Sequence, residues 1–279
     1  MNGTKVFEDS YCGVFAKQDE FLECLESIGR NSFWERKKSK NLRLVPITDD
    51  SRVAEELREK YAEEGLDEGI ITDTILNTGL LLKVRNQYYP VRCCAIKSIL
   101  DRAGISGAGL RRVEKNVYAR ILNDCLKVAR GEALLRISEG KVSAVLGGDC
   151  HDYAVLNMEQ IFMHSVEYFN SEFKGCTWLG GFYEHDMASA LWELSGEDKL
   201  LEAYQKELCL HGKEPEEMKP AVRITTSDTG SGGANIYPML LSGNGNTTIN
   251  LGSPLRLGHR NGTRISDFDE QLKMLYGKY

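Results

Sequence analysis

The sequence predicts an α+β fold: an antiparallel sheet with a β-hairpin followed by a helix, helices packed on one face, and a β-rich C-terminal part. Three observations support this prediction. Residues 133–147 alternate between apolar and polar side chains around Glu139-Gly140, as the two strands of a hairpin do. Helical patterns with a 3.6-residue period lie before and after this hairpin. Beyond residue 220, short alternating runs between clusters of Gly, Asn and Ser replace the helical period.

The N-terminal part of the chain carries two helical patterns. Residues 19–29 place apolar side chains on one face and end at a glycine, which is a common helix stop. Residues 51–64 begin at a serine, which is a good N-cap, and end before another glycine. Residues 70–84 fit either a strand or a helix. A short helix is expected to end near Arg102.

The middle of the chain contains the longest helical pattern, at residues 108–130, where a basic face lies opposite an apolar face. In the hairpin that follows, Gly140 supplies the positive φ that a tight turn requires. Asn157 and Gln160 form an N-cap pair for the next helix. Residues 186–210 predict one long helix or two short ones.

The C-terminal part has strand patterns and one helix. Residues 211–220 are the best candidate for a linker, and residues 228–234 and 242–247 are predicted turns between short strands. A final helix is capped by Ser266. We expect three regions, the last of which forms a domain of its own or one domain with the second. These are an N-terminal helical region with charged segments at 1–69, a central α+β core at 70–210, and a β-rich region ending in a helix at 211–279.

Composition narrows the class of protein. The chain has 279 residues, enough for one large domain or two small ones, and is 42% hydrophobic and 27% charged, as ordinary soluble proteins are. No apolar run approaches the roughly 20 residues of a membrane-spanning helix, and the N-terminus lacks the apolar core of a secretion signal. The eight cysteines include no C-x-x-C pair, which indicates reduced thiols. We therefore expect a cytoplasmic protein with no membrane partner.

Charge is unevenly distributed along the chain. The net charge of −6 argues against a protein built only to coat nucleic acid. However, residues 30–43 hold six basic residues and one acid, whereas residues 49–68 hold nine acids and three bases. Each run could form either a solvated surface or a binding surface.

Two segments contain residue types that can carry out catalysis. Asp149-Cys150-His151-Asp152 could contribute to a metal site or pair a thiol with a histidine, but no ligand spacing supports a metal and sequence neighbours seldom face each other. Asp228-Thr229-Gly230-Ser231 is similar to the D-T-G-S turn of aspartic proteases, which need two such turns. We interpret both segments as turns, and predict no catalytic residue, no metal and no cofactor.

The strongest candidates for a binding surface are basic. Lysine and arginine bind nucleic-acid backbones, and aromatic rings stack on the bases of single strands. Phe33 and Trp34 adjoin the first basic run, Tyr88 and Tyr89 lie shortly before the basic helix pattern, and Tyr118 lies within it. An exposed helix face and a flexible loop remain the alternatives. The candidate nucleic-acid-binding residues are Arg36, Lys37, Lys38, Lys40, Arg43, Arg111, Arg112, Lys115 and Arg120.

The hairpin also carries a family resemblance. It lies in Leu134-Leu135-Arg136, Gly140 to Val142, Ala144 to Leu146, Asp149, Tyr153, Leu156-Asn157, Ile161-Phe162, Thr226 to Gly230, and Ile236-Tyr237-Pro238. With these residues the chain resembles the phage/plasmid-like family of proteins of unknown function. Members of that family share a pattern close to L-x-R-x-x-x-G-x-V-R-A-x-L-S-D-x-Y, followed by L-D-N and a helix. The chain departs from this pattern at Ser143, where the family has arginine, and at Gly147-Gly148.

The resemblance implies a gene on a phage, prophage or plasmid, hence a bacterial cytoplasm, but no established activity. Three functions stay open. The first is a DNA-transaction protein that binds or anneals single-stranded DNA as a homo-oligomer, since the order of hairpin and helix is similar to the core of single-strand annealing proteins. The second is a non-enzymatic inhibitor of a host defence system, which would bind a host protein through the acidic residues 49–68. The third is a hydrolase that uses residues 149–152. We favour the first.

Overall fold

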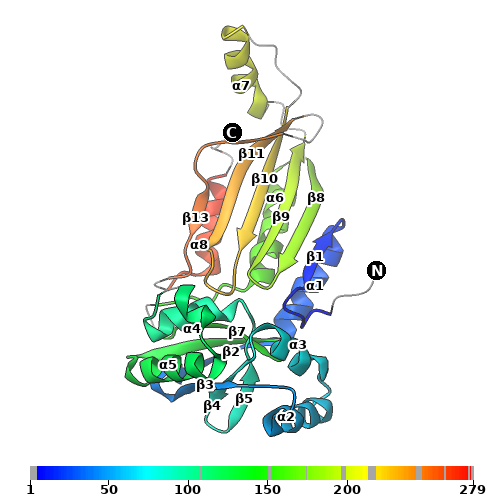
Figure 1. The fold of residues 1–279 in the computed structure, drawn as a ribbon. Coiled ribbons are helices and arrows are strands. Elements are labelled where there is room, and N and C mark those ends of the chain that lie inside the picture. Colours follow the sequence, from blue (N-terminus) through cyan, green and yellow to red (C-terminus); the bar gives the residue numbers. More distant parts are fainter. Residues whose placement is uncertain are drawn as a thin grey trace. The chain divides into compact units, whose positions relative to one another are not determined.

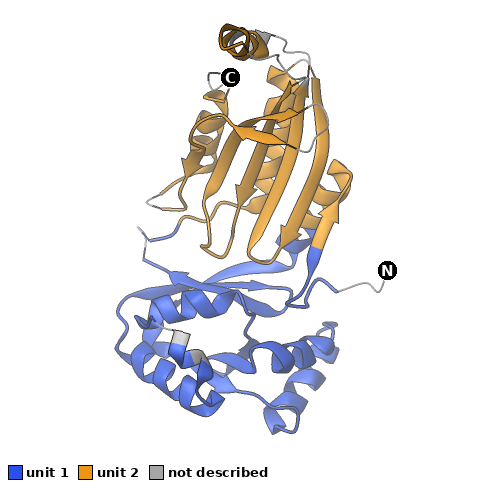
Figure 2. Ribbon diagram, turned by 45° about the horizontal axis from the view of Figure 1, so that its top comes forward, with its two compact units in different colours: residues 1–12, 27–153 blue, residues 13–26, 154–279 orange. Residues whose placement is uncertain are grey.

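The computed structural model describes residues 5–106, 108–149, 152–173, 175–195, 199–212, 218–242, 247–260, 262–275 and 277. Its helices and antiparallel sheets form an α+β fold, which confirms the predicted class. The chain divides into two compact units, shown in Figure 2. Unit 1 comprises residues 1–12 and 27–153, and unit 2 comprises residues 13–26 and 154–279. The expected division into regions 1–69, 70–210 and 211–279 stays a prediction.

Unit 1 contains two three-stranded antiparallel sheets. The first has the strand order β2-β6-β7 and the second the order β3-β4-β5. The strands are β2 (Ser32–Lys38), β3 (Leu42–Pro46), β4 (Leu80–Val84), β5 (Gln87–Pro90), β6 (Glu132–Ser138) and β7 (Lys141–Gly147). The helices are α2 (Arg52–Glu63), α3 (Gly69–Asn77), α4 (Ala95–Ala103) and α5 (Lys115–Val128), with 3₁₀ turns η1 (Ser39–Asn41) and η2 (Ala108–Arg112).

The sheet β3-β4-β5 is buried on one face and partly covered on the other. Leu42, Leu44 and Leu82 point into a cluster with Leu122 and Leu126 of α5. On the other face, one end of the sheet packs against α2 and α3 in a second cluster. Because these helices reach only one end of the sheet, the side chains that alternate onto the rest of the second face are open to solvent. The residues of the second cluster include Val45, Leu81, Leu57, Tyr61, Ile70 and Ile71.

The two sheets of unit 1 are joined at Val91-Arg92, directly after β5. The amide of Val91 donates to the carbonyl of Leu80 in β4, at 3.0 Å, and the amide of Arg92 donates to Val142 in β7, at 2.9 Å. Val91 and Val142 form an isolated parallel bridge. Two consecutive residues thus connect the hairpin β6-β7 to the sheet β3-β4-β5.

A buried ionic network surrounds this junction. The Lys141 side chain has no exposed surface, and its ammonium group donates to Asp9, at 2.9 Å, and to Asp73. Arg92 is 1% exposed; its guanidinium pairs with Asp9 and donates to the carbonyl of Phe7. Burial tends to raise the pKa of Asp9, but Lys141, the backbone amide of Cys93 and Arg92 outweigh it and hold the pKa below its usual range.

Unit 2 is built on a seven-stranded sheet with the order β1-β8-β9-β10-β11-β12, where β13 also pairs with β11. In its core, Trp192 of the sheet packs edge to face against Phe169 and at a tilt against Phe162, both from the helix at Met158–Glu172. The strands are β1 (Cys12–Phe15), β8 (Gly175–Glu184), β9 (Met187–Ser195), β10 (Met218–Thr226), β11 (Ala234–Ser242), β12 (Thr248–Asn250) and β13 (Leu255–Leu257). The helices are α6 (Met158–Glu172), α7 (Lys199–Leu210), α8 (Ile265–Lys273) and α1 (Gln18–Arg30), whose last residues belong to unit 1.

The hairpin prediction is confirmed. β6 and β7 pair around Glu139-Gly140, and both turn residues have positive φ, 50° and 74°. Residues 70–84 resolve into α3 followed by β4. Of the linker candidate 211–220, residues 218–220 belong to β10 and residues 213–217 lie outside the described residues.

Two helix predictions are wrong. The pattern at 108–130 is a 3₁₀ turn and a separate helix, because the backbone of Glu114, the N-cap of α5, is not helical, with a ψ of 146°. The residues expected to start the helix at 186–210 form strand β9, and α7 is the helix found among the described residues of this range. β9 is central in its sheet and buries Trp192 and Leu194, so tertiary packing outweighs local helix propensity there.

We predict that Lys141→Met lowers the free energy of unfolding by about 3 kcal/mol, because it leaves buried carboxylates with fewer cationic partners. Urea unfolding measures this loss. The matched control is Lys127→Met, since the half-exposed Lys127 pairs with Asp124 on α5 and should change stability by less than about 0.5 kcal/mol. Equal effects of the two substitutions would contradict a stabilising role of the network.

The low pKa of Asp9 predicts a specific pH dependence of stability. A carboxyl group with a depressed folded-state pKa contributes its full stabilisation above its unfolded pKa of about 4, and loses it as pH falls further. Below about pH 4, the stability of Asp9→Asn should therefore fall less steeply with decreasing pH than that of the original chain. Parallel unfolding curves across this range would contradict the assignment.

Candidate nucleic-acid interface

One row of side chains crosses the sheet β3-β4-β5 on its partly open face. In the strand register Arg43 lies opposite Lys83, and Lys83 lies opposite Tyr88. The strand neighbours Leu42 and Leu82 point the other way, into the core, as the alternation of a strand requires. Two cations and an aromatic ring are thereby presented side by side.

This row lines a groove of about 570 Å³. Lys40 of η1 and Arg85 of the β4-β5 turn add two further cations. None of the described lining residues is acidic, and within the described part of the chain none of the four cations forms an ion pair. The groove is therefore a concentrated positive surface on a chain with negative net charge. Its described lining residues are Lys40, Asn41, Arg43, Leu44, Val45, Lys83, Arg85, Tyr88 and Asn123.

The cations of the groove repel one another. Like charges directly opposite on neighbouring strands are destabilising, so the pair Arg43 and Lys83 has an unfavourable energy in the protein alone. The ammonium group of Lys83 lies 4.9 Å from the centre of the Tyr88 ring, which offsets part of that cost by a cation–π contact. A bound anion would remove the repulsion.

Arg85 lies in a backbone conformation that arginine disfavours. It begins the two-residue turn between β4 and β5 with a φ of 57°. For a residue with a Cβ the left-handed conformation costs roughly 1–2 kcal/mol, which glycine avoids. Unfavourable conformations of this kind cluster at functional sites, so a cation held here suggests a role for its charge.

Helix α5 fixes one side of the groove. The side-chain oxygen of Asn123 accepts a hydrogen bond from the amide of Leu44, at 2.7 Å, and its nitrogen donates to the Leu44 carbonyl, at 2.9 Å. These two bonds occupy backbone groups of β3, which is an edge strand. The strand that carries Arg43 is therefore held on both sides.

Only part of the first predicted basic run meets in the groove. Lys40 and Arg43 line it. Arg36 and Lys38 are exposed on one face of β2, while Lys37 lies on the opposite face and pairs with Glu35. Residues 36–43 were expected to form either a basic patch or a flexible loop. They form the end of β2, the 3₁₀ turn η1 and the start of β3.

The predicted basic helix face is also divided. Arg111 and Arg112 lie in η2, and the side chain of Arg111 is outside the described residues. Arg120 is exposed on α5, one helical turn before Asn123. Lys115 donates to the carbonyl of Thr78, at 2.6 Å, which gives its ammonium group a structural partner.

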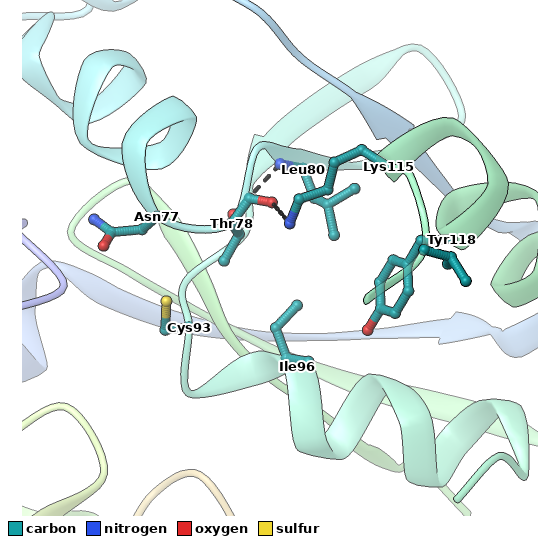
Figure 3. Close-up of a pocket in the computed structure, with 8 residues that line it drawn as sticks. Asn77, Thr78, Leu80, Cys93, Ile96, Lys115 and Tyr118 are labelled. Carbon is teal, nitrogen blue, oxygen red and sulfur yellow. Dashed lines mark hydrogen bonds between the residues drawn. The ribbon is translucent and has the colours of Figure 1, made fainter. Parts of the chain in front are cut away.

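Lys115 lines a separate cavity of about 260 Å³, shown in Figure 3. Tyr118 and Ile96 line the same cavity, as does Cys93. Partial burial of its sulfur side, together with a hydrogen bond to Asp9, raises the pKa of the Cys93 thiol to about 12, although the residue as a whole is exposed. The thiol therefore stays protonated at neutral pH and is a poor nucleophile.

Lys83 and Arg85, half of the cations in the groove, are not among the binding residues predicted from the sequence. They alternate with Leu82 and Val84, and the pair Tyr88-Tyr89 follows after a two-residue turn. This alternation indicates a strand with its cations on one face. However, residues 70–84 fit a helix equally well, so the strand could not be predicted from the sequence. Pairing with β3 across a long stretch of chain is what brings these cations to Arg43.

The other sequence candidates do not form a described reactive site. Cys150 and His151 lie outside the described residues, while Asp149 and Asp152 accept hydrogen bonds from nearby backbone amides, as turn residues do. Asp228-Thr229-Gly230-Ser231 lies between the paired strands β10 and β11, which confirms a turn. Among the described residues no three His, Cys, Asp or Glu side chains are grouped to hold a metal ion.

Comparisons with protein-family models, curated proteins and solved structures found no match to this chain. The resemblance to the phage/plasmid-like family therefore stays a prediction. None of the helices in the described part of the chain is long and apolar enough to cross a membrane.

We predict that Arg85→Gly leaves the free energy of unfolding unchanged or raises it by up to about 1 kcal/mol, because glycine accepts the positive φ. Arg85→Ala removes the same charge but keeps the strain, and should not gain stability. Thermal and urea unfolding of both variants measures the difference. A clear loss of stability in Arg85→Gly would show that the arginine side chain is needed for folding.

Proposed function

We propose that this protein binds single-stranded DNA, and that the groove on the sheet β3-β4-β5 binds its backbone. The observation that carries the proposal is the convergence of Lys40, Arg43, Lys83 and Arg85, none of which has an ion-pair partner among the described residues. Phosphate groups are the natural counter-charge for such a surface, since binding releases their condensed counterions.

The aromatic ring in the groove favours a single strand over a duplex. Tyr88 lies beside Lys83 within the groove. A single strand can place a phosphate on the cations and a base on the ring at the same time, whereas a duplex keeps its bases stacked inside. Asn41 and Asn123 add amide groups to the lining, although both hydrogen-bonding ends of Asn123 already bind Leu44.

The resemblance to the phage/plasmid-like family supports a role in DNA transactions of a phage or mobile element in a bacterial host. Annealing by a homo-oligomer belongs to the same proposal, but its support from the fold is weaker. The hairpin β6-β7 belongs to unit 1 and helix α6 to unit 2, so hairpin and helix do not form one compact core. The groove, and not the order of hairpin and helix, is the basis for DNA binding.

A second candidate function is binding to a host protein as an inhibitor of a defence system. Helix α2 exposes several carboxylates that face solvent, and only some of them pair with bases, as Glu56 does with Arg52. Such a surface could attract a basic partner. The exposed acids of α2 are Glu55, Glu56, Glu59 and Glu63.

We predict that the double variant Arg43→Ala/Lys83→Ala binds a fluorescent oligodeoxythymidine less tightly than the original chain does. Each lost phosphate contact should make the slope of log K against log salt concentration shallower by about 0.7, so the pair should change it by about 1.4. Fluorescence anisotropy over a salt series measures both the affinity and the slope.

The matched control removes two exposed cations of unit 1 outside the groove, Arg52 and Lys127. This control carries the same net charge as the groove variant, and its salt slope should stay close to that of the original chain. If the original chain does not bind the oligonucleotide at low salt, the proposed function is wrong. The second candidate would be favoured if a chain that does not bind DNA captured a specific host protein. Substituting Glu55 and Glu59 by Gln should then abolish this capture.

A further inference from the structure

The large sheet of unit 2 has one covered face and a second face that is open over part of its length, since Ala221 and Met239 at one end of this second face are buried. Strand register assigns Trp192, Ile224 and Ile236 to the covered face, where all three are buried. Helix α6 packs against β8, β9 and β10, and α8 against β11 and β13. In Figure 1 both helices lie behind the strands. Phe21 of α1 packs edge to face against Phe162 of α6, on the same side.

The open face follows from the same register, because side chains alternate along a strand. Its central row consists of Leu191 on β9, Arg223 on β10 and Tyr237 on β11. The next row holds Ser189, Thr225, Asn235 and Arg256, on β9, β10, β11 and β13. We call these seven residues the open-face platform.

The platform carries positive charge that its own sheet does not neutralise. Arg223 and Arg256 are exposed, and within the described part of the chain neither forms an ion pair. The adjacent row contains Glu193, but that carboxylate pairs with Lys219, at 3.1 Å. Glu184 lies farther along β8, near the turn into β9.

The aromatic ring of the platform is held by its neighbours on the same face of the sheet. Tyr237 is half-buried and packs against a small apolar cluster that includes Ala221 and Met239, both fully covered. A ring fixed in this way loses little conformational entropy when a flat partner stacks on it. Arg223 lies directly across from it in the strand register, so a cation and a ring adjoin.

We propose that the open-face platform is a second binding surface for single-stranded nucleic acid, on which Tyr237 stacks a base while Arg223 and Arg256 contact phosphates. The uncompensated positive charge selects a polyanion over a neutral protein surface. The hydroxyl and amide groups of Ser189, Thr225 and Asn235 can bond base edges or sugars. The inference shares its ligand class with the proposed function, but it lies on the other unit and rests on different residues.

The test uses the full chain and an oligodeoxythymidine that carries one 2-aminopurine, a base whose fluorescence falls when it stacks on an aromatic ring. Tyr237→Leu should weaken binding about tenfold and reduce the fluorescence change on binding. Tyr237→Phe keeps the ring and should retain both. Because no charge is lost, the salt slope should be the same in both variants, and circular dichroism checks that both fold.

Arg223→Gln gives an independent measurement. It should make the salt slope shallower by about 0.7, while its control Lys219→Gln, from the neutralised pair, should change the slope less. Unchanged affinity and fluorescence in Tyr237→Leu, together with an unchanged slope in Arg223→Gln, would overturn the inference. The inference would also be overturned if the original chain bound no DNA but bound a specific protein, and if Tyr237→Leu lost that protein.

The same measurements separate this inference from the proposed function. If Arg43→Ala/Lys83→Ala weakens binding and Tyr237→Leu does not, the groove is a DNA site and the platform is not. If Tyr237→Leu weakens binding and the groove variant does not, the platform is a site and the groove is not. Reduced binding in both variants supports two surfaces.

Discussion

Unit 1 depends on a lysine that has no contact with solvent. Lys141 begins β7, directly after the hairpin turn, and its ammonium group bonds Asp9 and Asp73, which lie 132 and 68 residues away in sequence. Burying these charges is costly unless each is paired, so the hairpin, the N-terminal segment and α3 can reach their positions only together. Arg92 completes the network by binding Asp9 and the Phe7 carbonyl.

The groove depends on this network through a short stretch of chain. Arg92 follows β5 after a single residue, and its amide joins β7 while the amide of Val91 joins β4. Holding Arg92 therefore fixes the end of β5, the strand that carries Tyr88 beside Lys83. At the other edge of the sheet, Asn123 of α5 bonds both backbone groups of Leu44 in β3. The mutually repelling cations thus sit on a sheet fixed at both edges.

The sequence predicted local features well and distant ones poorly. The turn at Glu139-Gly140 was predictable because alternation and turn chemistry agree within a few residues. The helix expected at 108–130 is interrupted at Glu114, although its apolar period continues across the break. Lys40 and Arg43 were visible as a charge run. Lys83 joins them only through strand pairing, and the burial of Lys141 depends on carboxylates that no local pattern connects to it.

The proposed contact between the groove of unit 1 and single-stranded DNA can be located along the backbone. Hydrogen–deuterium exchange of the full chain, with and without an oligodeoxythymidine at low salt, tests it most directly, because exchange reports where the backbone is protected. If the groove binds DNA, exchange at residues 40–45 and 83–88 should slow on adding DNA, while exchange in the acidic helix α2 should not change. Unchanged exchange at 40–45 and 83–88, with DNA demonstrably bound, would contradict the proposed contact.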